Sequence, residues 1–254
     1  MAAWRRTPDL GLCETQARAE ASQDVVVDDS EDPSGSRNSL NWAGYVTDET
    51  SNTYIAVQGD WTQPAVADTI CNNETEATWV GLGGYNTARL IQAGTAYLRG
   101  STIPIAWYEY LGANGAGIGL TGMPSVTVRK SDRLHAYVVI QRSTGQTTFY
   151  VADNTTGTSQ TVIKTLSVST YYDGTSPDFI DERLSYGGVI QNLYNFTNVP
   201  WTNTKVQNTA GTWSSLGSHG EIALNMRNID TDILAAPGAM TSTTTFLDDY
   251  KQCG

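Results

Sequence analysis

From residue 38 onward, short runs of alternating hydrophobic and polar positions, rich in Val, Ile, Tyr, Trp and Thr, follow one another along the chain. Clusters of Gly, Asn, Asp and Pro separate these runs at intervals of about 8 to 12 residues, a spacing typical of β-sandwiches and barrels. The pattern predicts strands at residues 41–46, 53–61, 77–82, 90–97, 105–110, 125–128, 134–141, 147–152, 159–166, 178–184 and 204–206. Residues 154–157, with the sequence NTTG, predict a hairpin turn.

Helical periodicity is not sustained anywhere, so no βαβ crossover is expected and the sheets should be antiparallel. Residues 38–254 have the length of a single all-β domain. Residues 1–37 have a basic start but no apolar stretch of the kind found in secretory signal peptides. We therefore expect a flexible leader, propeptide remnant or misplaced start over residues 1–37, followed by an antiparallel two-sheet β-sandwich over residues 38–254.

Composition excludes several classes of partner. Only 16% of the residues are charged, and the net charge is −11, so the clustered Lys and Arg of a nucleic-acid-binding surface are missing. No apolar run approaches about 18 residues, and the hydrophobic content is too high for a disordered chain, so neither a membrane span nor disorder is expected. The three cysteines are Cys13, Cys71 and Cys253. Both a Cys71–Cys253 disulfide and two unrelated thiols remain open.

The familiar hydrolytic centres find little support. The chain has two histidines, His135 and His219, and neither HExxH nor GxSxG, so a zinc site and a Ser-His-Asp triad are not expected. The paired Asp-Thr-Gly turns of pepsin-like enzymes are absent from the sequence, and Cys71 has no histidine nearby in sequence. Carboxylate and carboxamide chemistry is what remains, without a metal or another cofactor.

Six short segments carry a specific resemblance. They are NWAGY at residues 41–45, VQGDWTQP at 57–64, WVGLGG at 79–84, LIQAGT at 90–95, AWYEY at 106–110 and PDFIDE at 177–182. In this order they resemble the motifs of the glutamic peptidases, the eqolisin family of scytalidoglutamic and aspergilloglutamic peptidases and their bacterial relatives. The resemblance runs from about residue 38 to about residue 245.

The resemblance implies a concanavalin A-like, jelly-roll-type sandwich and an acid-acting endopeptidase that is secreted and acts on proteins and peptides. A monomer is the default expectation for its oligomeric state. It makes Gln92 and Glu182 the catalytic pair, and it places Trp79, Trp107 and Glu109 around the site. Three departures concern substrate contacts and loop bracing: Gly83 stands where the family commonly has Asp, Leu111-Gly112 replaces Tyr-Pro, and Asp178 replaces Glu. The family's disulfide partners near the glutamine loop are also missing.

The proposed pair makes chemical sense without a metal. Peptide hydrolysis needs a base that takes a proton from water and a donor that stabilises the oxyanion, and Glu182 and Gln92 can fill these roles. A carboxylate with a reference pKa of about 4.3 stays partly ionised in acid, where an imidazole is protonated and cannot act as a base. The strand period puts Gln92 on one face with Leu90, and Trp107 on one face with Glu109.

Two other functions use the same kind of sandwich. A glycoside hydrolase would flank a sugar with Glu109 and Glu182 and stack it on Trp107, which gives Gln92 no role. A lectin-like carbohydrate-binding module would have no catalysis, and the departures at Gly83 and Leu111 leave this alternative open.

Overall fold

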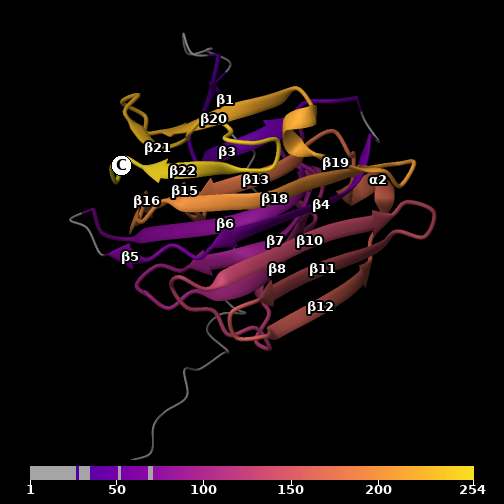
Figure 1. Cartoon of the computed structure of the whole chain (residues 1–254), viewed down its shortest axis with the longest axis horizontal. Helices are drawn as coiled ribbons and strands as arrows, with labels where there is room; N and C mark the ends of the chain where they lie inside the picture. Colours follow the sequence, from indigo (N-terminus) through magenta and orange to yellow (C-terminus); the bar gives the residue numbers. More distant parts are fainter. Residues whose placement is uncertain (1–26, 29–34, 51–52, 68–70) are drawn as a thin grey trace, which may run out of the picture.

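A computed structural model of the chain describes residues 27–28, 35–50, 53–67 and 71–254. Its strands form two antiparallel sheets packed face to face (Figure 1), which confirms the predicted β-sandwich. The described helical segments are short: one α-helix, α2 (Val168–Tyr171), and two 3-10 turns, η1 (Ala113–Gly115) and η2 (Leu216–Ser218).

The first sheet, here called the front sheet, carries the predicted site. Its strands in spatial order are β9 (Gly117–Gly122), β8 (Ile105–Leu111), β7 (Leu90–Tyr97), β6 (Glu74–Gly83), β13 (Pro177–Glu182), β3 (Trp42–Thr47) and β20 (Glu221–Arg227). At its edge, β2 (Arg37–Ser39) runs parallel to β20, and β1 (Val27–Asp28) pairs with β2.

The second sheet, the back sheet, lies behind it. Its strands in spatial order are β12 (Thr158–Thr165), β11 (Gln146–Asp153), β10 (Arg133–Gln141), β4 (Tyr54–Thr62), β18 (Val199–Asn208), β22 (Phe246–Tyr250) and β21 (Ile233–Pro237), with β19 (Trp213–Ser215) beside β18. Strand β21 also pairs with β20, so the two sheets join along that edge. Short pairings complete the fold: β5 (Val66–Ala67) with β17 (Asn195–Phe196), β14 (Ser185–Tyr186) with β15 (Val189–Ile190), and β16 (Asn192–Leu193) parallel to β6.

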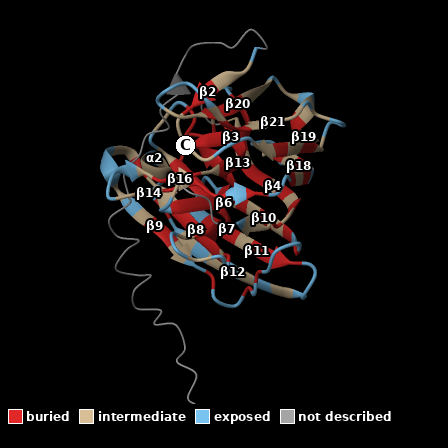
Figure 2. Cartoon of the chain, turned by 90° about the vertical axis from the view of Figure 1, so that its left-hand side faces the viewer, coloured by how far each residue is buried: buried red, intermediate tan, exposed pale blue. Residues whose placement is uncertain are grey.

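Strand alternation divides the apolar residues into two clusters. Phe179 and Val80 of the front sheet pack against Phe149 and Val138 of the back sheet and form the core between the sheets. The second cluster lies on the opposite face of the front sheet and contains Trp42, Trp79, Trp107 and Ile180. Buried residues are concentrated in the central strands, and exposed ones in the loops and outer strands (Figure 2). The front sheet is therefore covered on both faces, which explains why its strands read as nearly continuous buried runs.

The predicted strand at residues 125–128 is wrong. Val126 and Val128 are buried in the core between the sheets, which produces the alternating pattern. The backbone N–H groups of Ser125 and Thr127, however, donate to the side chains of Gln160 (2.9 Å) and Thr158 (3.2 Å) on β12, not to the backbone of a neighbouring strand. An extended segment held by side chains thus imitates the sequence pattern of a strand.

The sequence pattern also missed strands near the C-terminus. Strands β20, β21 and β22 have the sequences EIALNMR, ILAAP and FLDDY, in which Ala, Asn and Asp weaken the β signal. Strand β9, with the sequence GIGLTG, was missed because of its three glycines. The predicted hairpin turn at residues 154–157 connects β11 and β12.

Only a short part of the predicted leader is described, whereas the C-terminal residues are described to the end of the chain. Of the predicted leader, residues 1–26 and 29–34 lie outside the described residues, and Val27–Asp28 forms β1. Near the C-terminus, a disulfide joins Cys71 and Cys253, with their Cα atoms 6.2 Å apart; Cys13 lies outside the described residues. Within the described part of the chain, no helix is long and apolar enough to cross a membrane.

Candidate active site

A cavity opens on the face of the front sheet that points away from the back sheet. Its volume is about 50 Å³, which is enough for at least one water molecule. The residues that line it are Asn41, Trp42, Leu90, Gln92, Glu109, Leu111, Leu120, Glu182, Leu184 and Ser185. Three of the predicted site residues, Gln92, Glu109 and Glu182, are therefore brought together, although they come from strands far apart in the sequence.

Gln92 and Glu109 form one side of the cavity. They face each other in the register of β7 and β8, so their side chains project from the same face of the sheet. The Gln92 side-chain amide donates a hydrogen bond to the Glu109 carboxylate. Gln92 is 3% exposed, and its amide oxygen has no hydrogen-bond partner among the described residues. Because an amide nitrogen carries two hydrogens, Gln92 keeps one N–H for another acceptor.

Glu182 forms the opposite side of the cavity, at the end of β13. The Trp79 indole N–H donates to its Oε2 atom at 2.8 Å, and the Asn41 amide donates to its Oε1 atom at 3.1 Å. Burial raises the pKa of Glu182 from its ordinary value to about 7, although the hydrogen bonds from Trp79 and Asn41 act in the opposite direction. The carboxyl therefore gains or loses its proton close to neutral pH.

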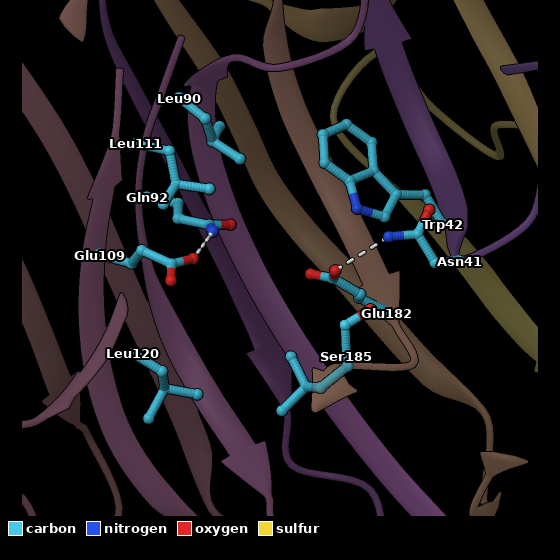
Figure 3. Close-up of a pocket in the computed structure, with 10 residues that line it drawn as sticks. Asn41, Trp42, Leu90, Gln92, Glu109, Leu111, Leu120, Glu182 and Ser185 are labelled. Atoms are coloured by element: carbon cyan, nitrogen blue, oxygen red, sulfur yellow. Dashed lines mark hydrogen bonds between the residues drawn. The ribbon is translucent and has the colours of Figure 1, made fainter. Parts of the chain in front are cut away.

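Figure 3 shows two hydrogen-bonded pairs, Gln92 with Glu109 and Asn41 with Glu182, on facing sides of the cavity. Gln92 and Glu109 lie on one side, and Glu182 lies on the other beside Asn41 and Trp42. The amide end of Gln92 and the carboxyl end of Glu182 both point into the space between them. A carboxyl with a pKa near neutrality and the carboxamide of Gln92 thus face one small cavity, whose other lining residues include four leucines.

Glycines keep this space open. Gly81 lies opposite Gln92 in the register of β6 and β7. A Cβ atom at Gly81 would lie 2.8 Å from the Trp79 ring and 3.2 Å from the Gln92 Cβ atom, so a larger residue would displace both side chains. At Gly94, opposite Trp79, a Cβ atom would lie 2.1 Å from the Thr78 carbonyl oxygen. The glycines of the WVGLGG and LIQAG segments therefore set the positions of Trp79 and Gln92.

The predicted tryptophans do not line the cavity. Trp79 is completely buried and acts through its hydrogen bond to Glu182. Trp107 is completely buried beside it in the second apolar cluster, and it is not among the lining residues. The even spacing that puts Trp107 and Glu109 on one face is correct, but only Glu109 reaches the cavity.

Sequence reasoning gave no role to Asn41 and Trp42. Both lie in the NWAGY segment that carried the resemblance, and Trp42 faces Glu182 in the register of β3 and β13. The NWAGY segment was the only signal for these two residues, but a sequence does not tell which strand lies beside β13.

The backbone conformation explains the glycine at position 83: its φ is +91°, and a Cβ atom would lie 2.1 Å from the Arg89 carbonyl oxygen.

The two histidines are engaged elsewhere. His219 lies 3.0 Å from the Tyr54 hydroxyl and 2.8 Å from the Ser214 hydroxyl, and His135 contacts the Asp60 carboxylate. Neither histidine lines the cavity.

Comparisons with known proteins concern the family and the fold. The model of the peptidase A4 family matches residues 40–247. The fold is similar to a crystal structure of scytalido-glutamic peptidase with a peptide-based transition-state analogue, with 19% identity, a TM-score of 0.69, and coverage of 84% of this chain and 98% of that one. It is also similar to SCP-B, a member of the eqolisin family, in complex with the tripeptide Ala-Ile-His (19% identity, TM-score 0.66, coverage 84% and 98%).

A further similar structure is aspergilloglutamic peptidase from Aspergillus niger, with 21% identity, a TM-score of 0.58, and coverage of 70% of this chain and 99% of that one. A comparison with curated proteins found no match.

Proposed function

Because this chain belongs to the peptidase A4 family and is therefore a peptidase, we propose that it cleaves internal peptide bonds of proteins with Gln92 and Glu182 as its catalytic pair. The observation that carries this proposal is the cavity, into which both side chains point from opposite sides (Figure 3). No metal or covalent nucleophile is needed for the reaction that follows.

In this reaction, ionised Glu182 takes a proton from a water molecule as the water oxygen attacks the peptide carbonyl carbon. The remaining Gln92 N–H donates to the carbonyl oxygen as it becomes an oxyanion. When the tetrahedral intermediate collapses, the C–N bond breaks and Glu182 gives its proton to the leaving amine. Glu182 is then ionised again, and the products are a carboxylic acid and an amine.

Acid–base catalysis and one oxyanion donor do not account for the whole rate acceleration that a peptidase needs. General acid–base catalysis contributes about 10²- to 10⁴-fold, and one oxyanion donor about 10²- to 10³-fold. Glu109 holds the Gln92 amide through its hydrogen bond, so the donor is oriented before the substrate binds. The remaining acceleration must come from orienting the water and the peptide.

The pKa of Glu182 shapes the expected pH range. As a base it must be ionised, and with a pKa of about 7 only about 1% is ionised in the free enzyme at a pH two units lower. A base with a higher pKa is also intrinsically stronger, which offsets part of this loss. We therefore propose activity in mildly acidic medium rather than at the strongly acidic pH that a reference carboxylate pKa suggests.

The other two functions are less well supported. A glycoside hydrolase would need Trp107 as a stacking surface, but this side chain is completely buried. It would also need Glu109 as a free acid or nucleophile, whereas Glu109 accepts a hydrogen bond from Gln92. A lectin-like module has no use for a buried carboxyl with a pKa of about 7.

Secretion is also part of the proposal. The Cys71–Cys253 disulfide is of the kind that persists in oxidising compartments, which supports an extracellular protein.

The test is a casein-hydrolysis assay from about pH 3 to about pH 7, with soluble xylan as the alternative substrate. The variants are Gln92→Ala, Glu182→Gln and Glu109→Gln, and the matched controls are Gln141→Ala on β10 and Glu49→Gln, both exposed. We expect peptidase activity to fall by at least about 10²-fold in Gln92→Ala and Glu182→Gln, and to persist in the controls. Sugar release, or full activity in either catalytic variant, would refute the proposed pair.

A further inference from the structure

Four leucines form an apolar wall around the reacting groups. Leu90 begins β7, Leu111 ends β8, Leu120 lies on β9 and Leu184 follows β13. Leu90, Leu120 and Leu184 are 5%, 5% and 7% exposed, while Leu111 is half-buried and presents the most accessible surface. Leucines from four separate segments thus converge on one cavity, and one of them remains open to an incoming side chain.

The register relates this wall to the catalytic pair. Leu90 and Leu111 face each other across β7 and β8, two residues from Gln92 and Glu109 respectively. They lie one step, about 7 Å, along the strands on the same face. Figure 3 shows Leu90 and Leu111 on one side of the Gln92–Glu109 pair and Leu120 on the other. Side chains of an extended peptide also repeat on one face about every 7 Å, so a substrate with its carbonyl at Gln92 would place a neighbouring side chain at these leucines.

The chemistry of the wall selects an aliphatic side chain. The titratable groups among the lining residues are two acids, Glu109 and Glu182, and none of the ten residues is a Lys, Arg or His. A substrate carboxylate here would lie beside two other carboxyls without a cation to pair with it, which is unfavourable. An aliphatic side chain would instead remove apolar surface of the leucines from water, which is favourable.

We propose that Leu90 and Leu111 form a specificity subsite for an aliphatic side chain on a residue that flanks the scissile bond. The inference rests on the proposed function, since it names the substrate class of the same site. It is specific to this chain, because Leu111 stands where the sequence resemblance leads to a tyrosine.

A peptide series tests it. The peptides differ only in a residue flanking the scissile bond, which is Leu, Ala, Ser, Asp or Tyr, and mass spectrometry of the products identifies the bond cleaved. For the intact protein we expect kcat/KM to be at least about 10-fold higher with Leu than with Ala or Ser on one side of the bond, and lowest with Asp.

Leu111→Asn should lower kcat/KM for the Leu peptide by at least about 10-fold and leave the Ala peptide within about 2-fold. Leu247→Asn on β22, outside the cavity, is the matched control and should behave as the unmodified protein.

Equal cleavage of all peptides, a preference for Asp, or an unchanged Leu111→Asn profile would overturn the subsite. If these results accompany activity that still depends on Gln92 and Glu182, the proposed function stands and the subsite alone fails. If the protein cleaves none of the peptides, or cleaves them equally well in the Glu182→Gln variant, both fail.

Discussion

Replacing Asp248 with asparagine should extend the pH range over which the protein stays folded. Asp248, Asp181 and Glu76 come from β22, β13 and β6, and all three are completely buried between the sheets. The Thr78 hydroxyl lies 2.6 Å from a carboxyl oxygen of Glu76 and 2.6 Å from one of Asp181. The Trp201 indole N–H donates to Asp181 at 3.4 Å.

Burial raises the pKa of all three carboxyls above the ordinary range, and the charge of Asp181 raises the pKa values of Glu76 and Asp248 further. Hydrogen bonds from Asp248, Thr78, Trp201 and Glu76 oppose the rise for Asp181. Asp181 therefore ionises first, while Glu76 and Asp248 keep their protons to a higher pH.

The effect on stability follows from the two retained protons. In the unfolded chain these carboxyls lose their protons near about pH 4. Because their pKa values are raised in the folded state, the stability present below that pH is lost as the pH rises toward the folded-state values. Each retained proton costs about 1.4 kcal/mol per pH unit, so two protons cost about 5 to 6 kcal/mol between about pH 4 and about pH 6. That is comparable to the whole folding free energy of many domains.

Asparagine at position 248 keeps a permanent N–H donor for Asp181 and has no proton to lose. The slope of the unfolding free energy against pH should therefore fall by about 1.4 kcal/mol per pH unit, a relative gain of about 3 kcal/mol at about pH 6. Urea denaturation followed by tryptophan fluorescence over this range measures the slope, which a uniform loss of stability does not change.

Asp249→Asn, at a half-exposed position that is ion-paired to Lys251 at 3.5 Å, controls for the loss of one negative charge on the same strand. If Asp248→Asn keeps the slope of the unmodified protein, the assignment of retained protons to this buried cluster is wrong.

Three further predictions concern the candidate site, the packing of the front sheet and the disulfide. Asn41→Leu removes a donor that favours ionised Glu182, so the acid side of the kcat/KM profile should move to higher pH; an unmoved profile would show that this bond does not tune the base. Gly94→Ala places a Cβ atom 2.1 Å from the Thr78 carbonyl oxygen, whereas Gly122→Ala meets nothing within 4 Å. Urea denaturation should therefore show a loss of about 3 kcal/mol or more for the first variant only, and equal stabilities would contradict the packing. Replacing Cys71 and Cys253 with serine opens a link across 182 residues, which the chain-entropy model values at about 5 kcal/mol; an unchanged unfolding midpoint in the presence and absence of reductant would speak against the bridge.

The sequence was sufficient to predict those strands in which the alternation of side-chain types matches the burial of the residues. Residues 90–97 and 105–110 were predicted almost to the residue, because their branched and aromatic side chains alternate between two buried faces. The same rule failed at residues 125–128, where alternating burial occurs without strand pairing. It also failed at β22, whose Asp248 faces the core as a protonated carboxyl and not as the polar residue that an alternation rule assumes.

Three residues of the candidate site could be predicted from the sequence, but the surroundings of Glu182 could not. Motif order pointed to Gln92, Glu109 and Glu182, which all line the cavity, and strand period put Glu109 on the face that reaches it. The register of β13 against β3 and β6 is a long-range property that no local pattern contains. That register places Asn41, Trp42 and Trp79 around Glu182, and the burial it produces moves the pKa of this residue to about 7.

Two sets of buried carboxyls therefore make opposite demands on pH. Glu182 must lose its proton to act as a base, which favours a pH close to 7. Glu76 and Asp248 must keep their protons for the sheets to stay packed, which favours a lower pH. The two sets are linked through shared strands, since Asp181 and Glu182 are neighbours on β13, and Glu76 and Trp79 both belong to β6, while Asp248 lies on β22. Burial on one face of these strands raises the pKa of the proposed base, and burial on the other face raises the pKa of the core carboxyls, so we expect the working pH to lie in the interval between these two effects.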